Sequence, residues 1–127
     1  PKISDFAAWN VDGDQSEFLF QGNKVIILSS NMSKMSTSNL EEMIALVKSL
    51  EGAPVDVVLM AAATQEEIDS FLSAQNWSIV GLQADATVVK TIMRANPGIM
   101  VMRDGTVLAK YHHNNTPEAT EVLDIFL

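Results

Sequence analysis

The 127-residue sequence contains no cysteine, so every chemistry that depends on a thiol is missing. Disulfide bonds, thiolate metal sites and thiol nucleophiles are all excluded. The absence says little about the cellular compartment, because a domain of this size can bury a stable core without disulfide bonds.

Basic residues are also scarce. Eight Lys and Arg stand against sixteen Asp and Glu, which gives a formal net charge of −8, and the basic residues form no cluster in the sequence. Nucleic acid and anionic membrane surfaces are poor partners for such a chain, because both are bound through cationic contacts. No apolar run approaches the roughly 20 residues of a membrane-spanning helix, so we expect no direct membrane insertion.

No linker, internal repeat or low-complexity tract divides the chain. We therefore expect one domain over residues 1–127, with an approach segment at 1–23 and a core at 24–127. The sequence begins at Pro1 rather than Met and ends on the apolar segment 122–127, so we expect it to be excised from a longer protein.

The approach segment carries Phe6 and Trp9, which we expect to anchor it on the core. Residues 10–14 read as a turn, with Gly13 free to adopt positive φ. This turn lacks the spacing and the distal Glu of an EF-hand, so a calcium site is disfavoured. Ser16–Phe20 is predicted to be a short edge strand.

The core opens with the apolar run Val25–Leu28, typical of a strand that is buried on both faces. An amphipathic helix follows and is predicted to begin between Ser36 and Leu40, with Ser38 and Glu41 as a capping box. Its apolar stripe consists of Leu40, Met43, Ile44, Val47 and Leu50.

Further elements follow in alternation. Val55–Ala61 is predicted to be a second buried strand, and residues 77–83 a weak third strand. Thr64 with Glu67 forms a capping box that opens one helix, and Asp85 can cap the next.

The last third of the chain predicts a hairpin and a helix. Asp104-Gly105 separates the apolar runs 99–102 and 107–112, a strong hairpin signal. Thr116 and Pro117 suit the N-cap and first positions of a final helix. Alternating strands and helices with one hairpin predict an α/β fold with a mixed central sheet and helices on both faces.

This order resembles the thioredoxin-like superfamily, and most of all its branch of peroxiredoxins and membrane-associated thiol reductases. Residues 5–28 are similar to the approach segment and first central strand of that branch. The element after this strand occupies the place of the redox turn and its helix. Asn96–Gly105 is similar to the family's cis-proline, strand and hairpin. The resemblance implies a three-layer thioredoxin-like fold.

The resemblance also implies a cis bond between Asn96 and Pro97. In the family, such a proline leaves backbone groups exposed beside a helix N-terminus, and that surface pairs with an extended peptide. The family's cysteines belong between Asn31 and Ser38, where this chain has none. Two registers stay open: Met35 and Ser38, or Met32 and Met35, occupy the cysteine positions. Neither supplies a thiol, and serine forms no disulfide.

A looser likeness links the sequence to the soluble C-terminal domain of some DoxX-type membrane proteins. It implies a bacterial, membrane-tethered chain in which a membrane domain of the same chain is a partner.

Other residues that could carry chemistry have simpler explanations. Met32 and Met35 offer thioethers that suit Cu(I), but no third ligand is near in sequence. His112-His113 cannot chelate one ion from a regular strand, because adjacent side chains face opposite sides. Glu41-Glu42 and Glu66-Glu67 lie in first helical turns, where the helix dipole favours acids. The hydroxyls of residues 33–38 have no activating base nearby, and we expect no catalytic residue, metal site or cofactor.

We therefore expect a redox-inactive thioredoxin-like module, not an enzyme, that binds a protein or peptide partner through the former active-site surface. Two alternatives stay open. One is a structural or assembly domain of a membrane-associated protein, and the other is a small-anion-binding domain or non-thiol enzyme on the same fold. The candidate binding residues are Asn31, Met32, Ser33, Lys34, Met35, Ser36, Asn96 and Pro97.

Overall fold

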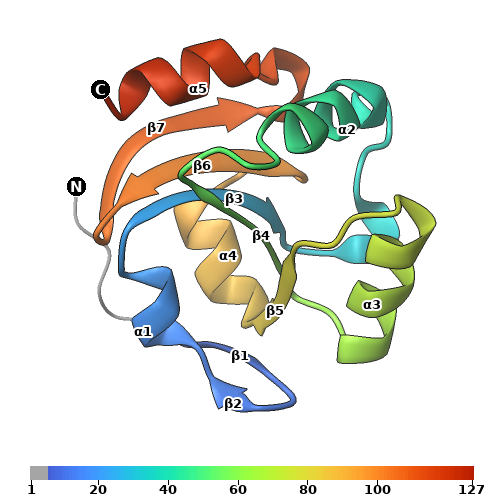
Figure 1. Cartoon of the computed structure of the whole chain (residues 1–127). Coiled ribbons are helices and arrows are strands. Elements are labelled where there is room, and N and C mark those ends of the chain that lie inside the picture. The colour runs from blue at the N-terminus through green and yellow to red at the C-terminus, as the bar shows by residue number, and fades with distance from the viewer. Residues whose placement is uncertain (1–5) are drawn as a thin grey trace.

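The computed structural model describes residues 6–127, which form a seven-stranded mixed sheet with helices on both faces (Figure 1). The strands are β1 (Ala8–Asn10), β2 (Gly13–Asp14), β3 (Asn23–Ser29), β4 (Asp56–Ala61), β5 (Val80–Ala84), β6 (Gly98–Arg103) and β7 (Thr106–His112). The helices are α1 (Ser16–Leu19), α2 (Leu40–Ser49), α3 (Gln65–Ala74), α4 (Ala86–Ile92) and α5 (Ala119–Ile125), with short 3₁₀ turns η1 (Met32–Lys34) and η2 (His113–Asn115). The strand order is β2-β1-β5-β4-β3-β6-β7.

Strand β3 is the buried strand that the sequence predicts. It pairs in parallel with β4 and antiparallel with β6. Val25 and Ile27 pack into a core cluster with residues of α2, α3 and α5, whereas Ile26 and Leu28 pack into a second cluster with residues of α1 and α4. Because successive side chains of a strand alternate between faces, a strand between two helical layers must be apolar throughout.

Local signals account for several boundaries. Thr64 and Glu67 form the predicted capping box at the start of α3, and Asp85 accepts hydrogen bonds from the backbone N–H groups of Thr87 and Val88 at the start of α4. Asp104 and Gly105 both have positive φ, which the tight turn between β6 and β7 requires. These three predictions are confirmed.

The N-terminal segment differs from the prediction. Residues 16–19 form helix α1 rather than a strand, because Asp14 Oδ1 accepts hydrogen bonds from the backbone N–H and the hydroxyl of Ser16 and starts the turn. Strand β1 joins the sheet beside β5, so part of the approach segment belongs to the core. Phe6 is buried as expected, but Trp9 is 37 % exposed. Asp5 lies outside the described residues.

The predicted N-caps of two helices are wrong. Helix α2 begins at Leu40, within the predicted interval, but its N-cap is Asn39 and no side chain caps it. The hydroxyl of Ser38 instead donates to Asn39 Oδ1 at 3.3 Å. Helix α5 begins at Ala119, because the Thr116 hydroxyl donates to the His113 carbonyl at 2.7 Å and closes η2 instead of capping a helix. Within residues 6–127, no helix combines the length and the apolar character that a membrane crossing needs.

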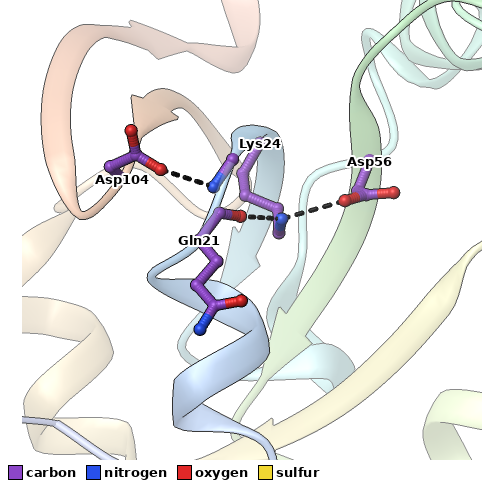
Figure 2. A network of polar contacts seen from close by, with 5 residues as sticks. Gln21, Lys24, Asp56 and Asp104 are labelled. Carbon is purple, nitrogen blue, oxygen red and sulfur yellow. Dashed lines mark hydrogen bonds and ion pairs between the residues drawn. The ribbon is translucent and has the colours of Figure 1, made fainter.

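Lys24, at the start of β3, is a buried cation that the sequence pattern does not reveal. It is 2 % exposed, and its Nζ donates to Asp56 Oδ2 at 2.9 Å and to the carbonyl of Gln21 (Figure 2). The same ammonium lies 4.5 Å from the centre of the Phe18 ring. These contacts join α1, β3 and β4 at the amino end of the parallel strands.

Asp104 makes further hydrogen bonds at this end of the sheet. Its carboxylate accepts a hydrogen bond from the Gly22 N–H at 2.7 Å (Figure 2). Its own N–H donates to the Gly22 carbonyl at 3.0 Å. These two hydrogen bonds connect the β6–β7 hairpin to the turn that precedes β3.

Removing the Asp56 carboxylate should leave the Lys24 ammonium buried without its counter-ion. We expect Asp56→Ala to lower the free energy of unfolding by about 1–3 kcal/mol, the usual cost of leaving a buried charged group short of a partner. Adding Lys24→Met should recover most of this loss, because the uncompensated charge is then gone. Urea denaturation of both variants measures the difference, and a double variant less stable than Asp56→Ala would contradict this role of Lys24.

Tyr111 joins β7 to α5. Its hydroxyl donates to Glu121 Oε2 at 2.7 Å. Burial, followed by the hydrogen bond to Glu121 and the charge of that carboxylate, raises the pKa of Tyr111 from 10.0 to about 12. Because the folded state favours the neutral phenol, its contribution to stability is complete below pH 10 and is lost as the pH rises towards about 12.

The titration of Tyr111 can be read without interference from other tyrosines, because it is the only one in the chain. We expect tyrosinate absorbance to show a midpoint near 12 in the folded protein, against 10.0 for an unperturbed tyrosine. Glu121→Gln should lower the folded midpoint, because the negative charge that opposes ionisation is removed. Circular dichroism checks that the chain stays folded, and a wild-type midpoint equal to that of the urea-unfolded chain would refute the coupling.

Candidate functional site

The chain leaves β3 into a short turn that is held by its own side chains. Asn31 Oδ1 accepts hydrogen bonds from the Ser33 N–H at 3.1 Å and from the Ser33 hydroxyl at 2.7 Å. The Lys34 N–H donates to the Asn31 carbonyl at 3.2 Å. An asparagine that captures the backbone two residues ahead is a common way to start a turn, and it gives η1 a defined shape.

Asn96 joins this turn to the segment that precedes β6. Its Oδ1 accepts from the Ser29 hydroxyl at 2.7 Å, and its Nδ2 donates to the Asn31 carbonyl at 2.9 Å. Its backbone carbonyl accepts from the Ser36 N–H at 2.9 Å. The Asn96–Pro97 peptide bond is cis. The structure thus brings together the two stretches of predicted site residues, 31–36 and 96–97.

The candidate residues differ in what they present to solvent. Ser33 and Lys34 are exposed, Met32 and Met35 are half-buried, and Pro97 is buried. Met32 packs against the core cluster of α2, α3 and α5, whereas Met35 belongs to neither core cluster.

The expectation that the cis-proline segment leaves its backbone groups open is wrong for the Asn96 carbonyl. That oxygen is paired with the N–H of Ser36. The Ser36 N–H and the Asn96 carbonyl are therefore both paired within the site.

Asn39 and His113 lie beside this region and were not among the predicted site residues. His113 Nδ1 lies 2.7 Å from Asn39 Oδ1, although 74 positions separate them in the chain. Because an amide oxygen only accepts, Nδ1 carries the proton and Nε2 is left as the acceptor. Burial, followed by the neighbouring His112, lowers the pKa of His113. No local sequence pattern predicts the hydrogen bond between His113 and Asn39.

The two histidines lie closer together than a regular strand allows. Strand β7 ends at His112 and His113 begins η2, so the ring centres are 4.2 Å apart rather than on opposite sides. His112 Nδ1 accepts the N–H of Asn114 at 3.0 Å and is therefore occupied. Within residues 6–127, no three His, Asp or Glu side chains gather into a set that could hold a metal ion.

The hydroxyls near the start of α2 do not form a nucleophile–base pair with His113. Ser38 Oγ and His113 Nδ1 both donate towards the same atom, Asn39 Oδ1. Ser36 Oγ lies 2.9 Å from Ser38 Oγ, which links the hydroxyls to each other. A nucleophilic serine needs a base that accepts its proton, and the protonated Nδ1 cannot do so.

Comparison with protein-family models gives no match, and comparison with curated proteins gives none. Solved structures do match over nearly the whole chain. Reduced Prx3 from Vibrio vulnificus has a TM-score of 0.73 at 12% identity, over 100% of this chain and 97% of that one. A secreted Mycobacterium tuberculosis disulfide oxidoreductase homologous to Escherichia coli DsbE has a TM-score of 0.64 at 20% identity, over 95% and 94%. StoA from Bacillus subtilis has a TM-score of 0.65 at 10% identity, over 100% of both chains.

At these identities the likeness concerns the fold. The mixed sheet, the helices on both faces and the neighbours of Prx, DsbE and StoA type agree with the class that the sequence predicts. This chain has the thioredoxin-like α/β fold and contains no cysteine.

Proposed function

We propose that this domain is a redox-inactive thioredoxin-like module that binds a protein or peptide partner. The binding surface, called here the turn surface, consists of residues 31–36 together with Asn96 and Pro97. The observation that carries the proposal is the set of hydrogen bonds made by Asn96, which hold the turn against the proline segment in a chain that has no thiol to position.

Met35 supplies the apolar contact in this proposal. It is half-buried at the end of η1 and lies outside both core clusters, so its side chain contributes little to the packing of the core. Methionine is flexible and polarizable, which suits a surface that adapts to a partner. Lys34 beside it is exposed and adds a positive charge to a chain with a net charge of −8.

Pro97 contributes in a different way. Because it is buried, it shapes the floor beneath the turn and offers little area to a partner. Since the Ser36 N–H and the Asn96 carbonyl are paired with each other, the partner engages side chains in preference to these main-chain groups. A membrane domain in the same chain is one partner that the DoxX likeness suggests, and the full-length reading frame tests that tether.

Met35→Glu should weaken partner capture by roughly tenfold or more, because a charge is placed in an interface that excludes water. The melting temperature should change little, since Met35 lies outside the core clusters. Affinity capture from extracts of the source organism, followed by quantitative mass spectrometry, measures the loss.

Val11→Glu is the matched control for this change. Val11 is 85 % exposed on the β1–β2 hairpin, at the far side of the sheet from β3, and the substitution adds the same charge. Proteins lost from Met35→Glu but kept by Val11→Glu are the expected partners. Equal retention by wild type and both variants would contradict the turn surface as the binding site.

We also expect the purified protein to show neither thiol–disulfide exchange nor thiol peroxidase activity, because the reactive thiolate of such enzymes is absent. Insulin reduction with dithiothreitol and consumption of hydrogen peroxide should both match the buffer blank, while an active thioredoxin serves as the positive control. Turnover above the blank would show that the domain has an activity that this proposal denies.

A further inference from the structure

A surface depression lies between the end of β3 and helix α4. Its volume is about 610 Å³, and five side chains line it: Ser30, Thr87, Lys90, Thr91 and Arg94. Three of them carry hydroxyls and two carry positive charges. None is acidic or apolar, although acidic residues outnumber basic ones by two to one in this chain.

The spacing of these residues explains why they converge. Lys90 and Thr91 lie three and four positions after Thr87 on α4, so these three side chains share one face of the helix. Arg94 follows the end of α4 and lines the same depression. Ser30 follows the last residue of β3 and approaches from the sheet. Asp85 is the acid at the start of α4, and its Oδ1 accepts hydrogen bonds from the N–H groups of Thr87 and Val88.

The two cations are available for a ligand. Among residues 6–127, neither Lys90 nor Arg94 takes part in an ion pair. At the C-terminal end of α4, where the helix dipole is negative, the Lys110 Nζ donates a hydrogen bond to the Ile92 carbonyl at 2.7 Å. Thr91 Oγ1 donates to the Thr87 carbonyl at 2.8 Å, so Ser30 and Thr87 are the hydroxyls left to donate.

We propose that this pocket, called here the α4 pocket, binds a phosphate-type oxyanion such as that of a phosphate monoester. A phosphate monoester carries about −1.5 to −2 charges at neutral pH and three acceptor oxygens. Two cations and two hydroxyl donors match both its charge and its acceptors. A carboxylate carries one charge on two oxygens and leaves part of this set unused. Arg94 adds the planar fork that suits phosphate, and Lys90 adds a point charge.

The α4 pocket adjoins the turn surface without depending on it. Ser30 directly precedes Asn31, and Arg94 lies two residues before Asn96. The argument for an oxyanion uses only the five lining residues and their charges. Its test therefore stands or falls separately from partner binding at the turn surface.

The test is a titration of the ¹⁵N-labelled protein with inorganic phosphate at constant ionic strength and pH 7.5, followed by amide chemical shifts. We expect saturable shifts centred on the five lining residues. Lys90→Gln and Arg94→Gln should each weaken binding by roughly tenfold, because each removes a charge-assisted hydrogen bond. Lys48→Gln is the matched control: Lys48 is likewise a lysine in the last turn of a helix, but it lies on α2.

Each other outcome overturns the proposal. Shifts that do not saturate, that spread over all exposed lysines, or that Lys48→Gln weakens as much as Lys90→Gln would show general charge screening. Shifts of equal size with acetate at the same concentration would show that the pocket does not select a doubly charged oxyanion. Circular dichroism of the variants checks that any loss of binding does not come from unfolding.

Discussion

The hydrogen bonds of Asn96 are the constraint on which the candidate site of this molecule depends. The Asn96 side chain accepts a hydrogen bond from the Ser29 hydroxyl at the end of β3 and donates one to the Asn31 carbonyl in the turn. The Asn96 backbone carbonyl accepts a hydrogen bond from the Ser36 N–H. These bonds join the end of β3, the turn at residues 31–36 and the segment before β6, and they give the buried Ser29 hydroxyl its partner. An asparagine suits this place because its amide both donates and accepts.

Strand β3 is held by polar contacts at both ends and by apolar packing between them. At its start, Lys24 bridges the Gln21 carbonyl and Asp56, and at its end Ser29 bonds to Asn96. The residues between are buried on both faces. Apolar packing does not determine where a strand must begin and end, whereas a buried polar group costs free energy unless its partner is in place. The two polar ends therefore define the position of β3 relative to its neighbours.

The thioredoxin-like fold of this chain contains no cysteine, so no thiol lies at the end of β3. What remains at the end of β3 is a turn with exposed side chains, a half-buried Met35, and a neighbouring pocket that carries two positive charges. In a chain with a net charge of −8, this local reversal of sign makes the region electrostatically unlike the chain average. Both proposals concern this same end of the sheet, but they rest on different side chains.

The sequence by itself determined those elements whose causes are local. The caps at Thr64 and Asp85, the hairpin at Asp104-Gly105 and the apolar run of β3 all depend on residues within a few positions of one another. The resemblance to the thioredoxin-like superfamily added the juxtaposition of residues 31–36 with Asn96. Only the tertiary structure decided the rest: Asn39, which occupies the N-cap position predicted for Ser38, pairs with His113, and Lys24 pairs with Asp56. These partners are 74 and 32 positions apart, so which polar groups satisfy each other is settled only once the sheet has assembled.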